Sequence, residues 1–105
     1  MVQVPDNIVE LIKKFVERAR KDNIRITEAL LFGSYAKGTN NEWSDIDVAV
    51  VSPDFEGSWL FDNKKIQDAK LETSFDLETH PYRPEDFTTD NPFVKEILNY
   101  GIRIV

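Results

Sequence analysis

The chain has 105 residues, of which 41% are hydrophobic and 30% are charged, a balance typical of a folded globular domain and unlike that of a disordered chain. The absence of cysteine excludes disulfide bonds, thiolate nucleophiles and cysteine-based zinc sites, and a single histidine excludes a histidine-rich metal site. The 19 acidic residues outnumber the 13 basic ones and give a net charge of −6, so we expect no stable binding of nucleic acid. We expect one domain over residues 1–105, cytoplasmic, with no secretory signal and no membrane span.

The first half of the chain is predicted to form a helix and two strands. Apolar residues recur at helical spacing over 6–21, with charged residues on the other side of that helix. Segments 24–32 and 45–51 become continuously apolar toward their ends, which predicts strands that are deeply buried. Between them, segment 33–44 carries two glycines and two asparagines and is predicted to be irregular, opening with a helical turn.

The second half is predicted to contain two more helices and one or two strands. A helix is expected over 58–71, capped by Ser58, with Trp59, Ile66 and Ala69 on its inward side. A strand is expected over 73–79, followed by a loop at 80–87 that contains two prolines.

The C-terminal elements complete the fold-class prediction. A helix is expected over 91–100, with Asn91 as its cap and Gly101 at its end, and the tail 102–105 can add an edge strand. This order of elements predicts an α/β (α+β) fold, a small mixed sheet of three to four strands flanked by helices.

Two aspartates at the start of the second strand are the first candidates for chemistry. Side chains at i and i+2 of a strand point to the same face, about 6.5–7 Å apart, so Asp45 and Asp47 present two carboxylates together. Such like charges repel unless a cation lies between them, and oxygen ligands of this kind suit Mg²⁺ or Mn²⁺. An isolated Asp-x-Asp is more often only solvated charge, so the pair needs support from another feature.

That support comes from the turn that follows the first strand. Gly33 lets the backbone approach a ligand closely, and the Ser34 hydroxyl adds a hydrogen-bond donor at the opening of a helical turn. Lys37 can add charge, and Gly38 can add room. A phosphate-binding loop followed by a carboxylate pair predicts a site for a metal–nucleotide complex.

The residues Gly33-Ser34-Tyr35-Ala36-Lys37-Gly38, followed by Ser44-Asp45-Ile46-Asp47, resemble the signature of the nucleotidyltransferase superfamily that includes DNA polymerase beta. More narrowly, the chain resembles the minimal nucleotidyltransferases of bacteria and archaea. Tyr35 departs from the arginine that many relatives carry there. The resemblance implies the nucleotidyltransferase fold and a third carboxylate on a later strand. Asp76 matches the family's apolar–Asp–apolar pattern, and Glu78, on the same face of that strand, is the alternative.

The resemblance also implies a mechanism. Asp45, Asp47 and Asp76 would hold two Mg²⁺ ions, with Mn²⁺ as a substitute, and Gly33, Ser34, Lys37 and Gly38 would bind ATP or another nucleoside triphosphate. A nucleoside monophosphate, AMP in the case of ATP, would pass to a hydroxyl group and pyrophosphate would leave.

The same resemblance suggests a partner, because many minimal nucleotidyltransferases act as antitoxins of small helical HEPN-type proteins. Two alternatives stay open: a non-catalytic subunit that neutralises its partner, and a small-molecule nucleotidyltransferase of the aminoglycoside type, whose acceptor pocket could come from a homodimer. Three further residues are left with two interpretations each. His80 and Arg83 can touch the nucleotide or be structural, and Trp43 can stack on a base or cover the edge of the core.

Overall fold

The computed structural model describes residues 4–105 as one mixed four-stranded sheet with helices on both faces. Its elements are α1 (Asp6–Lys21), β1 (Glu28–Phe32), α2 (Ser34–Lys37), β2 (Ile46–Val51), α3 (Trp59–Lys65), α4 (Gln67–Thr73), β3 (Leu77–Tyr82), a 3₁₀ turn (Pro84–Asp86), α5 (Pro92–Tyr100) and β4 (Ile102–Arg103). The predicted fold class is therefore confirmed. In the part of the chain that is described, no helix combines the length and the apolar composition needed to cross a bilayer.

The sheet has the strand order β3-β2-β1-β4. β1 pairs antiparallel with both β2 and β4, whereas β2 and β3 run parallel. The parallel pair needs a crossover connection, and α3 and α4 provide it. The C-terminal tail does add the edge strand expected from its sequence.

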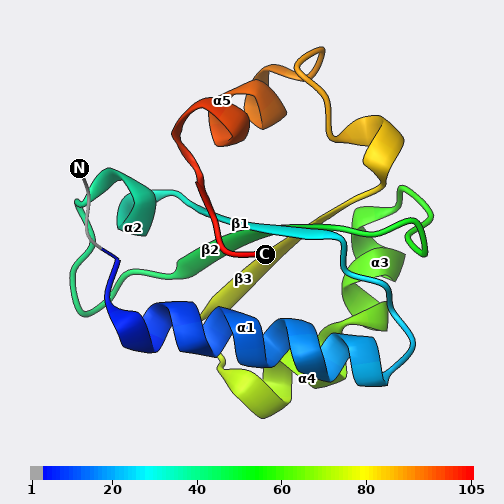
Figure 1. Ribbon diagram of the computed structural model, residues 1–105, viewed down its shortest axis with the longest axis horizontal. Coiled ribbons are helices and arrows are strands. Elements are labelled where there is room, and N and C mark those ends of the chain that lie inside the picture. Colours follow the sequence, from blue (N-terminus) through cyan, green and yellow to red (C-terminus); the bar gives the residue numbers. More distant parts are fainter. Residues whose placement is uncertain (1–3) are drawn as a thin grey trace.

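The two faces of the sheet are covered differently. Figure 1 shows α1 and α4 along one side of the sheet and α5 on the other. Along β2, Ile46, Val48 and Val50 belong to the core under α1, so the intervening residues, beginning with Asp47, face the α5 side. Because α5 is short and lies near β1, this second face is only partly covered, and it carries the polar residues of interest.

The larger core lies under α1, which forms as predicted. Its apolar stripe places Ile12, Phe15 and Val16 almost completely out of water. Burial of each such side chain contributes about 1.5–3 kcal/mol. On its outer side, Arg18 donates to Glu72 of α4 and so joins the two helices that cover this face.

Two predicted elements of the second half have different bounds in the structure. The helix expected over 58–71 is divided at Ile66, whose backbone leaves the helical region and whose side chain is fully buried in the larger core. The division turns α4 onto α1. The expectation that Trp59 faces inward is wrong, because it lies outside the core with 63% of its surface exposed.

The strand expected over 73–79 begins later and runs through Pro81. Thr73 still belongs to α4, where its hydroxyl donates to the carbonyl oxygen of Ala69. Pro81 lacks an N–H but is tolerated because β3 is an edge strand. This shift brings His80 onto the sheet rather than into a loop.

Candidate active site

The site is built on the parallel pair β2 and β3. Asp47 lies directly opposite Glu78 in the register, and both face the α5 side of the sheet. Asp45 stands two residues before Asp47, just ahead of β2, with its side chain exposed. Ligand atoms of Asp47, Glu78 and His80 all lie within 4.8 Å of one another. The sheet register alone therefore brings two carboxylates and an imidazole to one point.

His80 contributes a nitrogen atom to this point. Its Nε2 lies 3.6 Å from Oδ1 of Asp47 and 3.9 Å from Oε1 of Glu78. That atom is buried and has no hydrogen-bond partner in the described part of the chain. The imidazole is held by the ring of Phe32, whose centroid is 4.8 Å away in an edge-on arrangement. A buried nitrogen without a partner, aimed at two carboxylates, is the arrangement expected of a site that takes a cation.

The negative charges of the site act on Glu78. Partial burial, and then the charge of Asp47, raises the pKa of the Glu78 carboxyl above its ordinary value, with a smaller contribution from Asp45. The nearby His80 acts in the opposite direction. Like charges held together in this way favour a bound cation that relieves their repulsion.

Gly33 joins β1 to this site. Its φ of 72° and ψ of −148° lie in a region that only glycine adopts readily. A β-carbon there would overlap Oδ2 of Asp47, so the bare backbone of Gly33 lies directly against that carboxylate. Ser34 follows as the first residue of α2, and Gly38 closes the turn in the left-handed conformation. The structure thus places the backbone of Gly33 against the Asp47 carboxylate, with Ser34 as the next residue along the chain.

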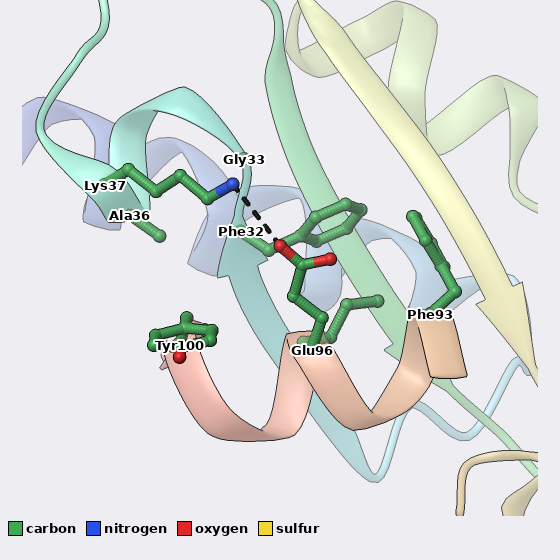
Figure 2. A pocket seen from close by; sticks show the side chains of 9 residues that line it. Phe32, Gly33, Ala36, Lys37, Phe93, Glu96 and Tyr100 are labelled. Atoms are coloured by element: carbon green, nitrogen blue, oxygen red, sulfur yellow. Dashed lines mark hydrogen bonds and ion pairs between the residues drawn. The ribbon is translucent and has the colours of Figure 1, made fainter. Parts of the chain in front are cut away.

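The side chain of Lys37 forms an ion pair with α5, in which its Nζ lies 3.4 Å from Oε1 of Glu96. This contact between two exposed side chains spans the space between α2 and α5 (Figure 2).

Asp76, the first choice for the third carboxylate, is not part of the cluster. It lies in the turn before β3, where its carbonyl oxygen accepts a hydrogen bond from the N–H of Ile46. Glu78, the alternative, occupies the position opposite Asp47. Asp76 lies just before β3 and Glu78 lies within it. The sequence pattern predicts this strand over 73–79, which would include both residues.

Other residues considered from the sequence lie as follows. Arg83 forms a bidentate ion pair with Asp86, with N–O distances of 2.6 and 3.0 Å, which is the structural interpretation. Trp43 is 85% exposed, so it does not cover the core edge. The sequence signal that could have placed His80 in the site is strand periodicity: in a strand that extends past residue 79, Glu78 and His80 lie on the same face.

A broad groove borders the carboxylates along the outer edge of β3. It has a volume of about 540 Å³ and reaches from Asp45 and Glu78 to α3 and α4. Several of its apolar side chains are exposed: Trp59, Leu60, Leu71 and Phe75. Lys64 and Lys70 add positive charge to its far wall. Exposed aromatic residues around a groove are typical of a contact surface for another molecule.

Asp47, Glu78 and His80, with Asp45 nearby, are the residues that could hold a metal. The carboxylate oxygens of Asp47 and Glu78 suit a divalent cation such as Mg²⁺ or Mn²⁺, whereas the imidazole nitrogen of His80 is a ligand typical of softer cations than Mg²⁺. The unpartnered His80 Nε2 supports this fit, because a purely structural histidine would have its buried nitrogen hydrogen-bonded.

Comparisons with known proteins agree with this geometry. Residues 9–104 match the family described as "Nucleotidyltransferase domain". A chain from Methanocaldococcus jannaschii, described as a "Putative protein adenylyltransferase", is 30% identical over 102 residues, which cover 92% of this chain and 98% of that one. The fold resembles the crystal structure of a "putative nucleotidyltransferase" from Sulfolobus solfataricus, with a TM-score of 0.67 at 17% identity over 92% of this chain and 78% of the other.

Proposed function

The chain belongs to the nucleotidyltransferase domain family, and from that premise we propose that it transfers AMP from ATP to a hydroxyl group of a protein partner. The observation that carries this proposal is the cluster of Asp47, Glu78 and His80 directly beside the glycine backbone of Gly33. A carboxylate cluster for cations next to a backbone that admits phosphate is what nucleotidyl transfer requires.

In this proposal Asp45, Asp47 and Glu78 hold divalent cations, in place of the set with Asp76, and His80 supplies a further ligand atom. When bound, such cations neutralise the triphosphate and lower the pKa of the attacking hydroxyl. Gly33 and Ser34 face the phosphates in this proposal. The backbone of Gly33 lies against Asp47, so phosphates bound to a cation at Asp47 would lie beside that backbone.

The reaction forms one bond and breaks one. The acceptor oxygen bonds to the α-phosphorus of ATP, the bond from that phosphorus to the bridging oxygen breaks, and pyrophosphate leaves with the electron pair. The hydroxyl proton passes to Glu78, which lies at the edge of the cluster that opens toward the groove along β3.

A protein acceptor is supported by two observations. The groove beside Asp45 and Glu78 carries exposed Trp59, Leu60 and Phe75, a surface suited to a polypeptide. The relative from Methanocaldococcus is described as acting on protein. The finer proposal, that the acceptor is a HEPN-type helical toxin and this chain its antitoxin, rests on the resemblance noted in the sequence.

The test is a labelling reaction with Mg²⁺ and the protein encoded beside this chain. ATP labelled at the α-phosphorus should label that neighbour, and ATP labelled at the γ-phosphorus should not. Transfer of the γ label would overturn the mechanism, because a phosphoryl group rather than AMP would have moved.

The matched control is Asp47→Asn, which removes one charge and keeps the shape of the side chain. It should stop labelling without preventing formation of a complex with the neighbour. A stable complex with no labelling by the unaltered chain would contradict the proposal and favour a non-catalytic subunit.

A further inference from the structure

A second cavity lies beside the proposed metal site, on the side away from the groove. It has a volume of about 180 Å³ and lies between the β1–α2 junction and α5. Its walls are mostly apolar and include Phe32, Ala36, Phe93, Ile97 and Tyr100. Figure 2 shows Phe32 and Phe93 at one end of this cavity and Tyr100 at the other, with Lys37 and Glu96 across it.

This cavity adjoins the carboxylate cluster through two residues. Gly33 lines the cavity, and its backbone also lies against the Asp47 carboxylate. Phe32, another wall residue, pairs with Asp47 across the β1–β2 ladder and packs against His80. A molecule held by phosphates at Gly33 therefore lies directly beside the apolar walls of this cavity.

The walls of the cavity suit a flat aromatic ring. The rings of Phe32 and Phe93 are perpendicular, with centroids 5.8 Å apart. Phe93 and Tyr100 nonetheless keep 47% and 67% of their surfaces exposed, so each has ring area available to another molecule. Stacking of a base on such rings is worth about 1–3 kcal/mol.

The size and the polar edge of the cavity further restrict the class of ligand that it can bind. Drug-sized ligands occupy roughly 300–1,000 Å³, so a cavity of about 180 Å³ holds only part of such a molecule. Lys37 and Glu96 place one donor group and one acceptor group along its rim. A heteroaromatic ring with polar edges satisfies both the apolar walls and this rim.

We propose that this cavity binds the nucleobase of the donor nucleotide, with Phe93 and Tyr100 as its stacking surfaces and Lys37 and Glu96 facing the polar edge of the base. The assignment rests on the proposed function, because it needs the triphosphate at Gly33. It gives α5 a role in nucleotide binding, and it leaves the groove along β3 to the acceptor.

The test compares two ligands by calorimetry in the presence of Mg²⁺: ATP, and inorganic tripolyphosphate, which has no base. The unaltered chain should bind ATP more tightly than tripolyphosphate. Phe93→Ala should weaken ATP binding by roughly 5- to 150-fold and leave tripolyphosphate binding unchanged. Tyr100→Ala should act in the same direction, and because Tyr100 is 67% exposed its removal leaves the core packing in place.

The matched control is Phe61→Ala, which removes a phenylalanine from the first turn of α3 that is 57% exposed, against 47% for Phe93. It should leave the affinity for both ligands unchanged. Equal affinity of the unaltered chain for ATP and tripolyphosphate would overturn the base assignment while leaving the proposed function standing. Loss of labelling by Phe93→Ala with unchanged ATP affinity would also overturn it, and would assign the cavity to the acceptor. Binding of neither ligand would instead contradict the proposed function.

Discussion

A β-carbon on Gly33 would overlap Oδ2 of the Asp47 carboxylate, so a side chain at residue 33 and the present position of Asp47 exclude each other. The end of β1 and the start of β2 thus meet at one point, where Gly33, the proposed phosphate contact, touches Asp47, the proposed metal ligand. A substitution at Gly33 must therefore disturb both.

The first prediction follows from this contact. Gly33→Ala should lower the free energy of unfolding by about 1–3 kcal/mol, because the backbone conformation is one that only glycine adopts readily. It should also abolish tight binding of ATP with Mg²⁺, because the new methyl group displaces the carboxylate of Asp47. Chemical denaturation and calorimetry measure the two effects.

Gly57→Ala is the control for that experiment. Gly57 also has a positive φ, of 86°, but a β-carbon there would meet the flexible side chain of Arg83 rather than the site. This variant should lose stability and keep its affinity for ATP. An equal loss of affinity in both variants would mean that strain, rather than the contact with Asp47, explains the effect of Gly33→Ala.

The second prediction separates the two candidates for the third carboxylate. Glu78→Gln should reduce AMP transfer on the order of 10²-fold or more, because it removes a charge opposite Asp47. Asp76→Asn should retain most of the activity, because its side chain is not part of the cluster. Initial rates of labelling with α-labelled ATP measure the difference, and the reverse order of effects would restore Asp76 as the third carboxylate.

The third prediction concerns the unpartnered nitrogen of His80. A buried polar atom without a hydrogen bond costs about 1–3 kcal/mol. His80→Phe should therefore raise the stability of the metal-free protein, since a phenyl ring can pack against Phe32 and Phe93 in its place. The same variant should bind Mn²⁺ more weakly, which a titration followed by electron paramagnetic resonance measures. Unchanged Mn²⁺ binding would remove His80 from the site.

The fourth prediction concerns pH and a part of the molecule far from the site. Hydrogen bonds from the Arg25 side chain and backbone N–H lower the pKa of Asp54 from 3.8 to about 2. Because the folded state favours the ionised carboxylate, this stabilisation is present above about pH 4 and is lost as the pH falls toward 2.

Asp54→Asn tests that prediction through melting temperatures measured across pH. The unaltered chain should melt at a higher temperature than the variant near neutral pH, and the difference should shrink as the pH falls toward 2. Arg25→Gln should reproduce the same loss of pH dependence, because it removes the side-chain donor of the pair. A difference that stays constant with pH would contradict the assignment.

Much of the fold could be predicted from the apolar pattern, because α1 buries one stripe at helical spacing and β2 is a short, continuously apolar run buried on both faces of the sheet. The bounds of β3 could not. Its residues include a histidine and a proline, and their strand conformation depends on pairing with β2, which local sequence does not encode. The choice between Asp76 and Glu78 depends on the same bounds, because the start of β3 decides which carboxylate lies opposite Asp47.

The exposure of Trp59 is the other feature that the spacing of apolar residues predicted wrongly. Trp59 stands at a position that helical spacing assigns to the core, yet it is 63% exposed, and the buried side chain of α3 is that of Asp62. Asp62 accepts hydrogen bonds from the backbone N–H groups of Glu56, Gly57 and Ser58, and so holds the loop before α3. A carboxylate that replaces an apolar residue in the interior cannot be recognised by a count of hydrophobic positions.

The parallel register of β2 and β3 couples folding to chemistry in this chain. A slip of one residue between the two strands would turn Glu78 toward the core under α1 and expose Leu77, so the same pairing error that separates the carboxylates also breaks the core. A mispaired molecule would consequently lack both cooperative unfolding and the proposed metal site. Natural selection on the interior residues Ile46 and Leu77 is then also selection on the active site, although neither side chain reaches it.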